Sequence, residues 1–277
     1  MMRTMGGPTV LMLGGTGRTG RRVLGELLAR GCTVRAIVRS RGALPPAVVG
    51  HPALTLLEGS LLSLGDSDWH CMVQGCDAVV SCLGHLVSVR GILGPPYRLV
   101  VRALQRATRA IEANQPGRPV RVILMSSVSV HDAPGVRTRR RAHERLFLAM
   151  LGLFLPPVRD NQRAADFLRV VIGGAHPLIE WAMVRPDTLE EGPAGAYILH
   201  EQLANSVFAP GHTRMANVAD FMAELVTDDA TWARWKGRMP VVLDAASSAE
   251  ATPHPLDAAG EPPALAVRAR PGAAAQG

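Results

Sequence analysis

Four glycines within seven residues form the clearest chemical pattern in the chain. Gly15, Gly17 and Gly20 match G-x-G-x-x-G, and Gly14, Gly17 and Gly20 match the related G-x-x-G-x-x-G. Both patterns need glycine because a side chain would block a tight turn and keep a diphosphate away from the backbone amides. The stretch, which we call the glycine loop, consists of Gly14, Gly15, Thr16, Gly17, Arg18, Thr19 and Gly20. We expect its amides, with the side chains that follow Gly17 as further donors, to bind the pyrophosphate of a dinucleotide.

The residues downstream of the glycine loop favour NADP(H) over NAD(H). In sites for NAD, an Asp or Glu about 20 residues past the glycines accepts hydrogen bonds from the ribose, and its charge would repel a 2′-phosphate. Arg39 stands at that position, Arg35 and Arg41 flank it, and residues 27–57 contain no Asp or Glu. We therefore expect NADP(H), with Arg39 at the 2′-phosphate. The alternative is that the three arginines form a solvated rim.

The elements around the glycine loop predict how it is held in place. Residues 9–13 are an apolar run, residues 18–30 carry leucines at helical spacing, and residues 33–38 are β-branched, which together make one βαβ unit. Further strands are expected at 53–57, 77–82, 120–125 and 181–184, and helices at 66–74, 97–114, 141–154, 161–172 and 219–227. This alternation predicts an α/β fold with a doubly wound parallel sheet, a Rossmann fold.

The sequence also predicts the domain organisation. We expect a single dinucleotide-binding domain over residues 1–244, with short C-terminal segments on the substrate side. Residues 245–277 are rich in Ala, Pro and Gly and lack apolar periodicity, so we expect a disordered tail there.

The composition of the chain limits which kinds of partner we expect. Thirty basic and 23 acidic residues give a net charge of +7, but Lys236 is the only lysine, a skew typical of GC-rich genomes, so we expect no nucleic-acid partner. No apolar run reaches the roughly 20 residues that span a bilayer, and the first residues lack the apolar stretch of a secretory signal. We expect a cytoplasmic protein without membrane contact. The four cysteines form no Cys-x-x-Cys pair, which predicts reduced thiols and no metal site.

Four later motifs follow the glycine loop in a characteristic order: Ser81-Cys82-Leu83-Gly84, Met125-Ser126-Ser127, Val184-Arg185-Pro186 and Asn217-Val218-Ala219-Asp220. With the loop, they make residues 8–244 resemble the atypical short-chain dehydrogenase/reductases, specifically the NAD(P)H-binding proteins related to NmrA-like regulators and to biliverdin reductase B-like flavin reductases. The resemblance implies that Cys82, Leu83 and Gly84 lie along the cofactor and that Ser126 borders the nicotinamide. It also implies that the segment with Arg185 closes over the site.

One departure from this family limits the mechanism. Ordinary short-chain reductases supply a proton from a Tyr-x-x-x-Lys pair, in which the lysine lowers the tyrosine pKa. In this sequence no tyrosine is followed by lysine at the fourth place, and Arg159 and Arg163 align with the two positions. Because arginine stays protonated, it cannot serve as an ordinary acid or base. Ketone reduction through the usual pair is therefore not expected.

Two functions remain open. The first is an NADPH-dependent reductase that passes hydride to a conjugated small molecule, such as a flavin or a quinone, and takes the proton from water or from a candidate catalytic residue, Ser127, His131 or Asp160. The second is a non-catalytic NADP(H)-binding sensor or regulatory protein of the NmrA-like type. A homodimer or a regulatory protein partner would fit either function.

Two weaker features lie between the motifs. Residues 137–141 are basic and precede an apolar stretch, for which a lid over the site or a dimer contact is favoured over membrane binding. His85 follows Gly84 and is a second histidine that could reach the nicotinamide.

Overall fold

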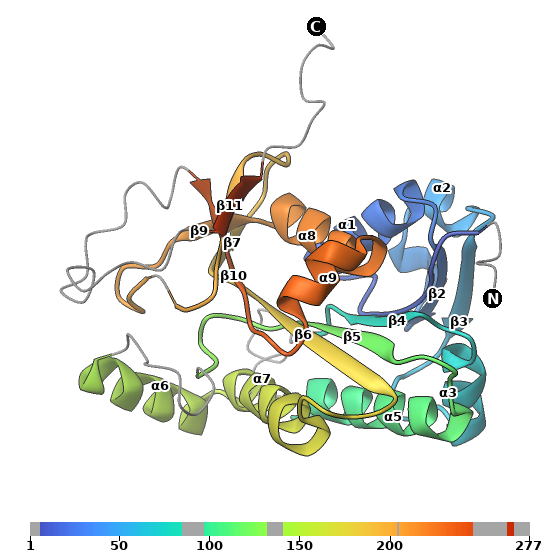
Figure 1. The fold of residues 1–277 in the computed structure, drawn as a ribbon, viewed down its shortest axis with the longest axis horizontal. Helices are drawn as coiled ribbons and strands as arrows, with labels where there is room; N and C mark the ends of the chain where they lie inside the picture. Colours follow the sequence, from blue (N-terminus) through green and yellow to red (C-terminus); the bar gives the residue numbers. More distant parts are fainter. Residues whose placement is uncertain (1–5, 85–96, 132–140, 204, 246–264, 269–277) are drawn as a thin grey trace, which may run out of the picture.

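The computed structural model describes residues 6–84, 97–131, 141–203, 205–245 and 265–268 (Figure 1). His85 and residues 137–140 therefore lie outside the described residues. The first half of the chain alternates strands and helices as expected, with short additional turns after β2. Its elements are β1 (Thr9–Leu13), α1 (Arg18–Ala29), β2 (Thr33–Val38), η1 (Arg41–Ala43), α2 (Pro46–Val49), β3 (Leu54–Glu58), α3 (Asp66–Val73), β4 (Ala78–Ser81), α5 (Leu99–Asn114) and β5 (Val120–Met125).

The second half contains two consecutive helices, a long strand and several short strands. Its elements are α6 (Ala142–Phe154), α7 (Pro156–Asp166), η2 (Phe167–Ile172, a π-helical turn), β6 (Ile179–Pro186), β7 (Thr188–Glu190), β8 (Tyr197–His200), β9 (His212–Arg214), α8 (Met215–Thr227), α9 (Asp229–Trp235), β10 (Val241–Asp244) and β11 (Leu265–Arg268). None of the helices in the described part of the chain is both long and apolar enough to cross a bilayer.

The main sheet confirms the predicted Rossmann-type α/β fold. In the described residues it has nine strands in the order β11-β8-β10-β6-β5-β4-β1-β2-β3. All neighbours from β10 to β3 pair in parallel, and the order reverses between β1 and β4, where open α/β sheets bind ligands. The sheet is not parallel throughout, because β8 runs antiparallel to both β10 and β11.

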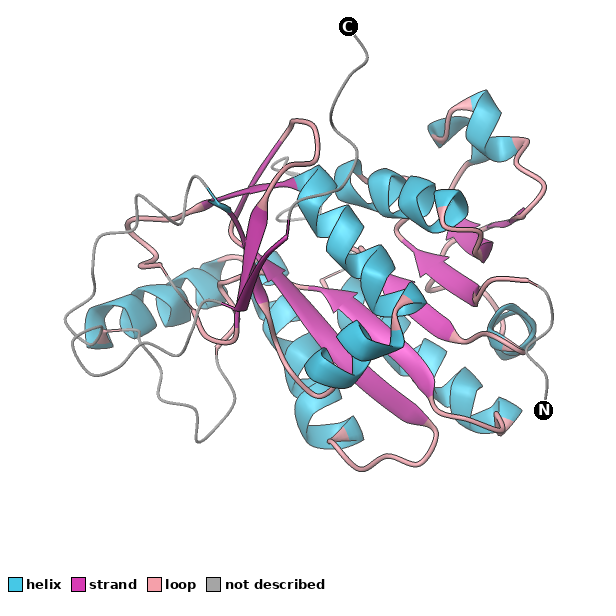
Figure 2. Cartoon of the chain, turned by 45° about the horizontal axis from the view of Figure 1, so that its top comes forward, coloured by secondary structure: helices cyan, strands magenta, loops and turns pink. Residues whose placement is uncertain are grey.

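Two helical layers bury both faces of the sheet. Helices α1, α8 and α9 cover one face, and α3, α5 and α7 cover the other (Figures 1 and 2). The alternation of side chains along β1 assigns Val10 and Met12 to the first layer and Leu11 and Leu13 to the second. A strand that is buried on both faces reads as a continuous apolar run, which is why β1 was recognisable in the sequence.

The structure corrects the bounds of two predicted helices and adds one strand that the sequence did not predict. The helix predicted at 161–172 begins at Pro156 and continues into the π-helical turn, and the helix predicted at 219–227 begins at Met215. Within residues 245–277, for which we expect disorder, the structure describes one strand, β11 (Leu265–Arg268), on the edge of β8. Strand pairing with a distant segment explains this, because such a partner leaves no local periodicity.

Candidate functional site

The glycine loop connects β1 to α1 at the carboxyl edge of the sheet, and at two of its glycines the neighbouring backbone leaves no room for a Cβ. Gly14 has a φ of +77°, and a Cβ on it would lie 2.8 Å from the carbonyl carbon and oxygen of Cys82. A Cβ on Gly20 would lie 2.0 Å from the carbonyl oxygen of Gly14. Because both positions lack a Cβ, the first turn of α1 packs closely against the end of β1, and Gly14 packs closely against the chain that follows β4.

The third glycine of the pattern faces outward instead. Gly17 is exposed, and its amide donates to the carbonyl oxygen of Gly14 at 3.1 Å. A Cβ on Gly17 would meet only that oxygen, at 3.4 Å, so the fold itself tolerates a side chain there. Gly15 is buried, where a Cβ would lie 3.3 Å from Met12 Cγ. The geometry therefore favours the pattern through Gly14, Gly17 and Gly20, in which the outer glycines fold the loop and the central one opens it to a ligand.

The first turn of α1 has backbone amides that no side chain caps and that could bind an anion. Its N-cap is Gly17, no side chain caps the helix, and its first turn contains no acidic residue. The first amides of a helix lack intrahelical acceptors and carry partial positive charge, which attracts phosphate groups. Thr16 is half-buried and Thr19 is buried, so only Arg18 of the loop's polar side chains extends into solvent.

Arg18 is engaged by a residue that the sequence did not point to. Its guanidinium donates to Glu191 Oε1 at 3.3 Å, and Arg22 on the next turn of α1 donates to the other oxygen of the same carboxylate. Glu191 directly follows β7. The segment after β6 therefore reaches across to the N-terminus of α1, and its carboxylate competes with any phosphate for Arg18.

Arg39 is the available cation at the end of β2. It is exposed and has no hydrogen bond or ion pair with any other described residue. The side chain of Arg35 instead reaches the C-terminal end of α3, where it donates to the carbonyls of Cys71, Met72 and Gln74. Of the three predicted arginines, Arg39 is thus the one positioned for a ligand.

Arg41 and Glu58 lie near Arg39, at the ends of β2 and β3. Arg41 donates to the carbonyl of Leu56 at 3.0 Å and lies 4.0 Å from the carboxylate of Glu58. Glu58 ends β3 and pairs in register with Val38, so it lies one strand away from Arg39. Glu58 directly follows the acid-free residues 27–57, and its ion pair with Arg41 partly neutralises its charge.

The chain after β4 lies beneath the glycine loop. Cys82 donates its amide to the carbonyl of Leu13 at 2.9 Å, and its carbonyl group touches Gly14. Its side chain is buried against Met222, and this burial raises the pKa of the thiol far above its usual range. Leu83 is also buried, whereas Gly84 is exposed, with open space where a Cβ would be. The backbone of this segment, rather than the thiol, is what the site presents.

Ser126 carries the most informative hydroxyl group of the site. Its amide donates to the carbonyl of Val184 at 2.8 Å, which fixes the residue at the end of β5. The hydroxyl is buried and has no hydrogen-bond partner in the described part of the chain, as is also true of Ser81 on the neighbouring strand β4. Buried hydroxyls without partners are costly, so both are natural acceptors or donors for a bound group.

Ser127 and His131, the two predicted proton donors that follow β5, both form hydrogen bonds within the protein. The hydroxyl groups of Ser127 and Ser129 lie 2.5 Å apart, and the Ser129 amide donates to Ser127 Oγ at 3.2 Å. The amide of His131 donates to Gln162 Oε1 at 3.0 Å, which anchors the chain after β5 on α7. Ser127 and His131 are both half-buried and follow the carboxyl end of β5, so they stay candidate proton donors.

Asp160, the third predicted proton donor, has a structural position instead. It is fully buried, and its carboxylate accepts hydrogen bonds from the amides of Val100 at 2.8 Å and Val101 at 3.3 Å. These are free amides of the first turn of α5, which a carboxylate stabilises. Asp160 therefore caps α5 from α7, and this structural role speaks against its predicted role as a proton donor.

Two further motifs serve the fold. Arg185, which the resemblance placed over the site, is buried and donates from Nε to the carbonyl of Met239 at 2.7 Å. Asn217 donates to Asp244 Oδ1 at 2.6 Å, and Asp220 accepts from Arg30 at 2.6 Å and from the Tyr197 hydroxyl at 2.9 Å. These contacts hold the C-terminal strands and α8 against the domain.

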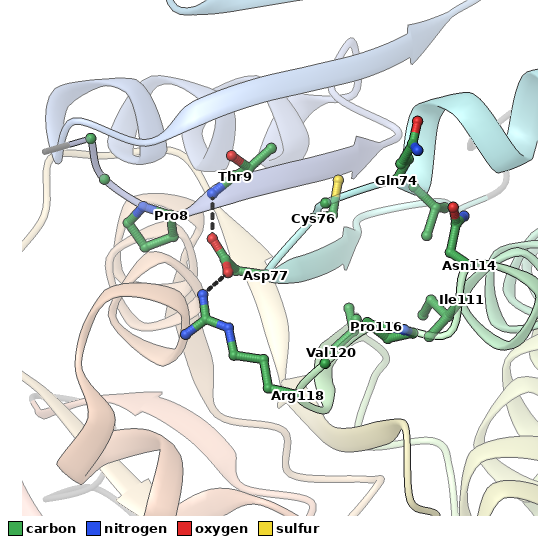
Figure 3. A pocket seen from close by; sticks show the side chains of 15 residues that line it. Pro8, Thr9, Gln74, Cys76, Asp77, Ile111, Asn114, Pro116, Arg118 and Val120 are labelled. Carbon is green, nitrogen blue, oxygen red and sulfur yellow. Dashed lines mark hydrogen bonds and ion pairs between the residues drawn. The ribbon is translucent and has the colours of Figure 1, made fainter. Parts of the chain in front are cut away.

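A hollow also exists at the opposite edge of the sheet. It has a volume of about 400 Å³ and is lined by the starts of β1 and β4 and by the loop after α5 (Figure 3). Its carboxylate, Asp77, accepts from the amide of Thr9 at 2.8 Å and pairs with Arg118. Because the amino ends of the strands line it, this hollow is separate from the glycine loop.

Comparison with known proteins agrees with this geometry. The family described as NAD(P)H-binding has a sequence model that matches residues 14–229. No curated protein matches the chain.

Solved structures share the fold over most of their length. A short-chain dehydrogenase/reductase (wide type) from Veillonella parvula, in complex with NADP, is 14% identical with a TM-score of 0.62 over 87% of this chain and 96% of that one. An oxidoreductase from Lactococcus lactis is 16% identical, with a TM-score of 0.58 over 85% and 90%. An anaerobilin reductase from Escherichia coli O157:H7 is 20% identical, with a TM-score of 0.59 over 88% and 99%. At these identities the likeness concerns the fold.

Proposed function

Because the chain belongs to the NAD(P)H-binding family, we propose that it is a reductase that uses NADPH to pass hydride to a conjugated acceptor such as a flavin or a quinone. The observation that carries the proposal is the glycine loop, in which Gly14 and Gly20 are closed by backbone contacts while Gly17 is exposed. That arrangement fits a diphosphate against the loop amides and the N-terminus of α1.

Residues that follow β2 and β5 at the carboxyl edge of the sheet would make the remaining contacts to the cofactor. The exposed Arg39 after β2 would hold the 2′-phosphate of the adenine ribose, because a guanidinium matches phosphate geometry. The unpartnered hydroxyl of Ser126 after β5 would bond the nicotinamide end. The NADP complex of the Veillonella parvula structure supports the same preference. In this arrangement the cofactor crosses the carboxyl ends of β2, β1, β4 and β5.

The chemistry of the site favours acceptors that need no strong acid. When bound, NADPH supplies the hydride. Arg159 and Arg163 occupy the positions of the usual tyrosine and lysine and stay protonated, and Asp160 is committed to α5. A conjugated ring delocalises the negative charge that it receives, so its proton can come from water or from Ser127 or His131. The chain's own task is then to position the two rings and to exclude competing reactions.

The capping role of Asp160 also favours a second candidate function, a non-catalytic NADP(H)-binding sensor of the NmrA-like type. With that carboxylate committed to α5, the predicted proton donors that remain are a paired serine and a histidine. A sensor needs cofactor binding without turnover. The fold serves both functions equally well.

One experiment separates the two functions. NADPH oxidation is followed at 340 nm with a panel of flavins and quinones, and NADPH binding to the same protein is titrated in parallel. The reductase predicts turnover with at least one conjugated acceptor that is lost in Gly17→Val. Tight binding without turnover of any acceptor would reject the reductase and support the sensor.

A further inference from the structure

Three arginines gather at the carboxyl edge beside α5 and α7. Arg98 is the N-cap of α5, and Arg159 and Arg163 lie one turn apart on α7. The two helices pack together (Figure 1), and the carboxylate of Asp160 bonds the amides of Val100 and Val101. This capping contact brings the start of α5, which carries Arg98, to the first turns of α7, which carry Arg159 and Arg163.

The charges of this cluster are not balanced within the described part of the chain. None of the three arginines has a hydrogen bond or an ion pair with another described residue, unlike Arg106, which pairs with Asp66. Partial burial, followed by repulsion from Arg98 and Arg159, lowers the pKa of Arg163 below its usual value. Asp160 opposes this effect, but it is one carboxylate among three cations. Clustered guanidinium groups without partners are a feature of sites that bind anions.

The cluster faces the chain segment that borders the expected nicotinamide site. Gln162 lies three residues after Arg159 on α7, a spacing that places these two residues on the same helix face, and its Oε1 accepts the amide of His131. Leu124 packs against the layer of α5 and α7, and the alternation along β5 directs Ser126 to this same side. The arginines and the unpartnered serine hydroxyl therefore border one region.

An exposed aromatic ring adjoins the cluster. Tyr97 precedes Arg98, and 49% of its surface is accessible. A flat conjugated ring can stack on tyrosine, while guanidinium groups bond an anionic substituent of the same molecule.

We propose that Arg98, Arg159 and Arg163 bind an anionic group, a carboxylate or a phosphate, on the molecule that accepts the hydride. This inference rests on the proposed reductase function and names its substrate class, a conjugated ring that carries an acidic side group. Arg159 and Arg163, at the positions of the usual proton-donating pair, would thereby have exchanged proton transfer for substrate recognition.

The test compares ring-matched acceptors that differ in charge. FMN and riboflavin share one ring and differ by a phosphate; a naphthoquinone propionic acid and its methyl ester differ by a carboxylate. Equilibrium binding of each to the protein saturated with NADP⁺ is measured for the wild type, Arg159→Gln, Arg163→Gln and the control Arg109→Gln, an exposed arginine further along α5. Turnover with NADPH is measured separately.

At least one anionic member is expected to bind tenfold or more tightly than its neutral partner. Arg159→Gln and Arg163→Gln should remove most of this preference, raise its KM and leave the neutral partner unchanged, whereas Arg109→Gln keeps it. Equal binding within both pairs would overturn the inference, as would an Arg163→Gln variant that weakens NADPH instead of the anion. A preserved charge preference without turnover of any acceptor would contradict the reductase and leave the anion site standing.

Discussion

The carbonyl oxygen of Gly14 lies 2.0 Å from the point where a Cβ on Gly20 would stand. Because no side chain stands at Gly20, the start of α1 can pack directly against the end of β1. Gly17, between the two, meets no such obstruction. Two glycines of one pattern thus serve the fold, and the third is the one that we propose for contact with the ligand.

Substitutions in the loop should separate these roles. Gly17→Val should leave the unfolding free energy within about 1 kcal/mol of the wild type, because its backbone φ of −71° suits any residue, and should abolish NADPH binding. Gly20→Ala should cost about 1–3 kcal/mol through overpacking. Urea unfolding and a fluorescence titration with NADPH measure both effects. An unfolded Gly17→Val, or one with normal affinity, would refute this division of roles.

Arg39 should set the preference between coenzymes. Arg39→Glu replaces the exposed cation after β2 with a charge that repels a 2′-phosphate, so the Kd for NADPH should rise by at least tenfold while the Kd for NADH changes little. Arg109→Glu changes the net charge equally at a distance and serves as the control. Equal weakening of both coenzymes would count against the assignment.

Asp160 should matter for stability. Asp160→Asn keeps the shape of the side chain but loses the charge that faces the Val100 and Val101 amides, and we expect a loss of about 1–3 kcal/mol. The midpoint of urea unfolding gives this value. A variant of normal stability that has lost all turnover would restore Asp160 as a catalytic residue.

Asp228 should contribute to the acid sensitivity of the fold. Its carboxylate accepts the Thr231 amide at 2.6 Å at the N-terminus of α9, and this backbone hydrogen bond, with one from the Thr231 side chain, lowers its pKa. Because the folded pKa is lower than the unfolded one, the stabilisation is complete above the unfolded value of about 3.9 and disappears as the pH falls through the folded pKa.

Asp228→Ala should therefore be less stable than the wild type by about 1 kcal/mol at pH 7. The difference should shrink in strongly acidic solution, as measured by thermal unfolding across pH. A difference that stays constant down to the lowest pH would show that the hydrogen bond is not the cause.

The parts that the sequence predicted are those with local signals. The order of β1, the loop and α1 follows from an apolar run, four glycines and leucines at helical spacing. The distance of Arg39 from the glycines is a local signal too, and its role at a 2′-phosphate stays a prediction. Strands β7 to β10 were missed because they have only three or four residues and depend on distant partners. The capping role of Asp160 was missed for the same reason, since the amides that it caps lie 60 and 59 residues earlier in the chain.

A crystal structure of the chain with NADP⁺ tests the central claim most directly. The account predicts diphosphate oxygens about 3 Å from the backbone amides that follow Gly17, with the 2′-phosphate beside Arg39. A dinucleotide bound elsewhere, for example in the hollow lined by Asp77 and Arg118 at the opposite edge of the sheet, with the glycine loop making no contact to it, would contradict the account.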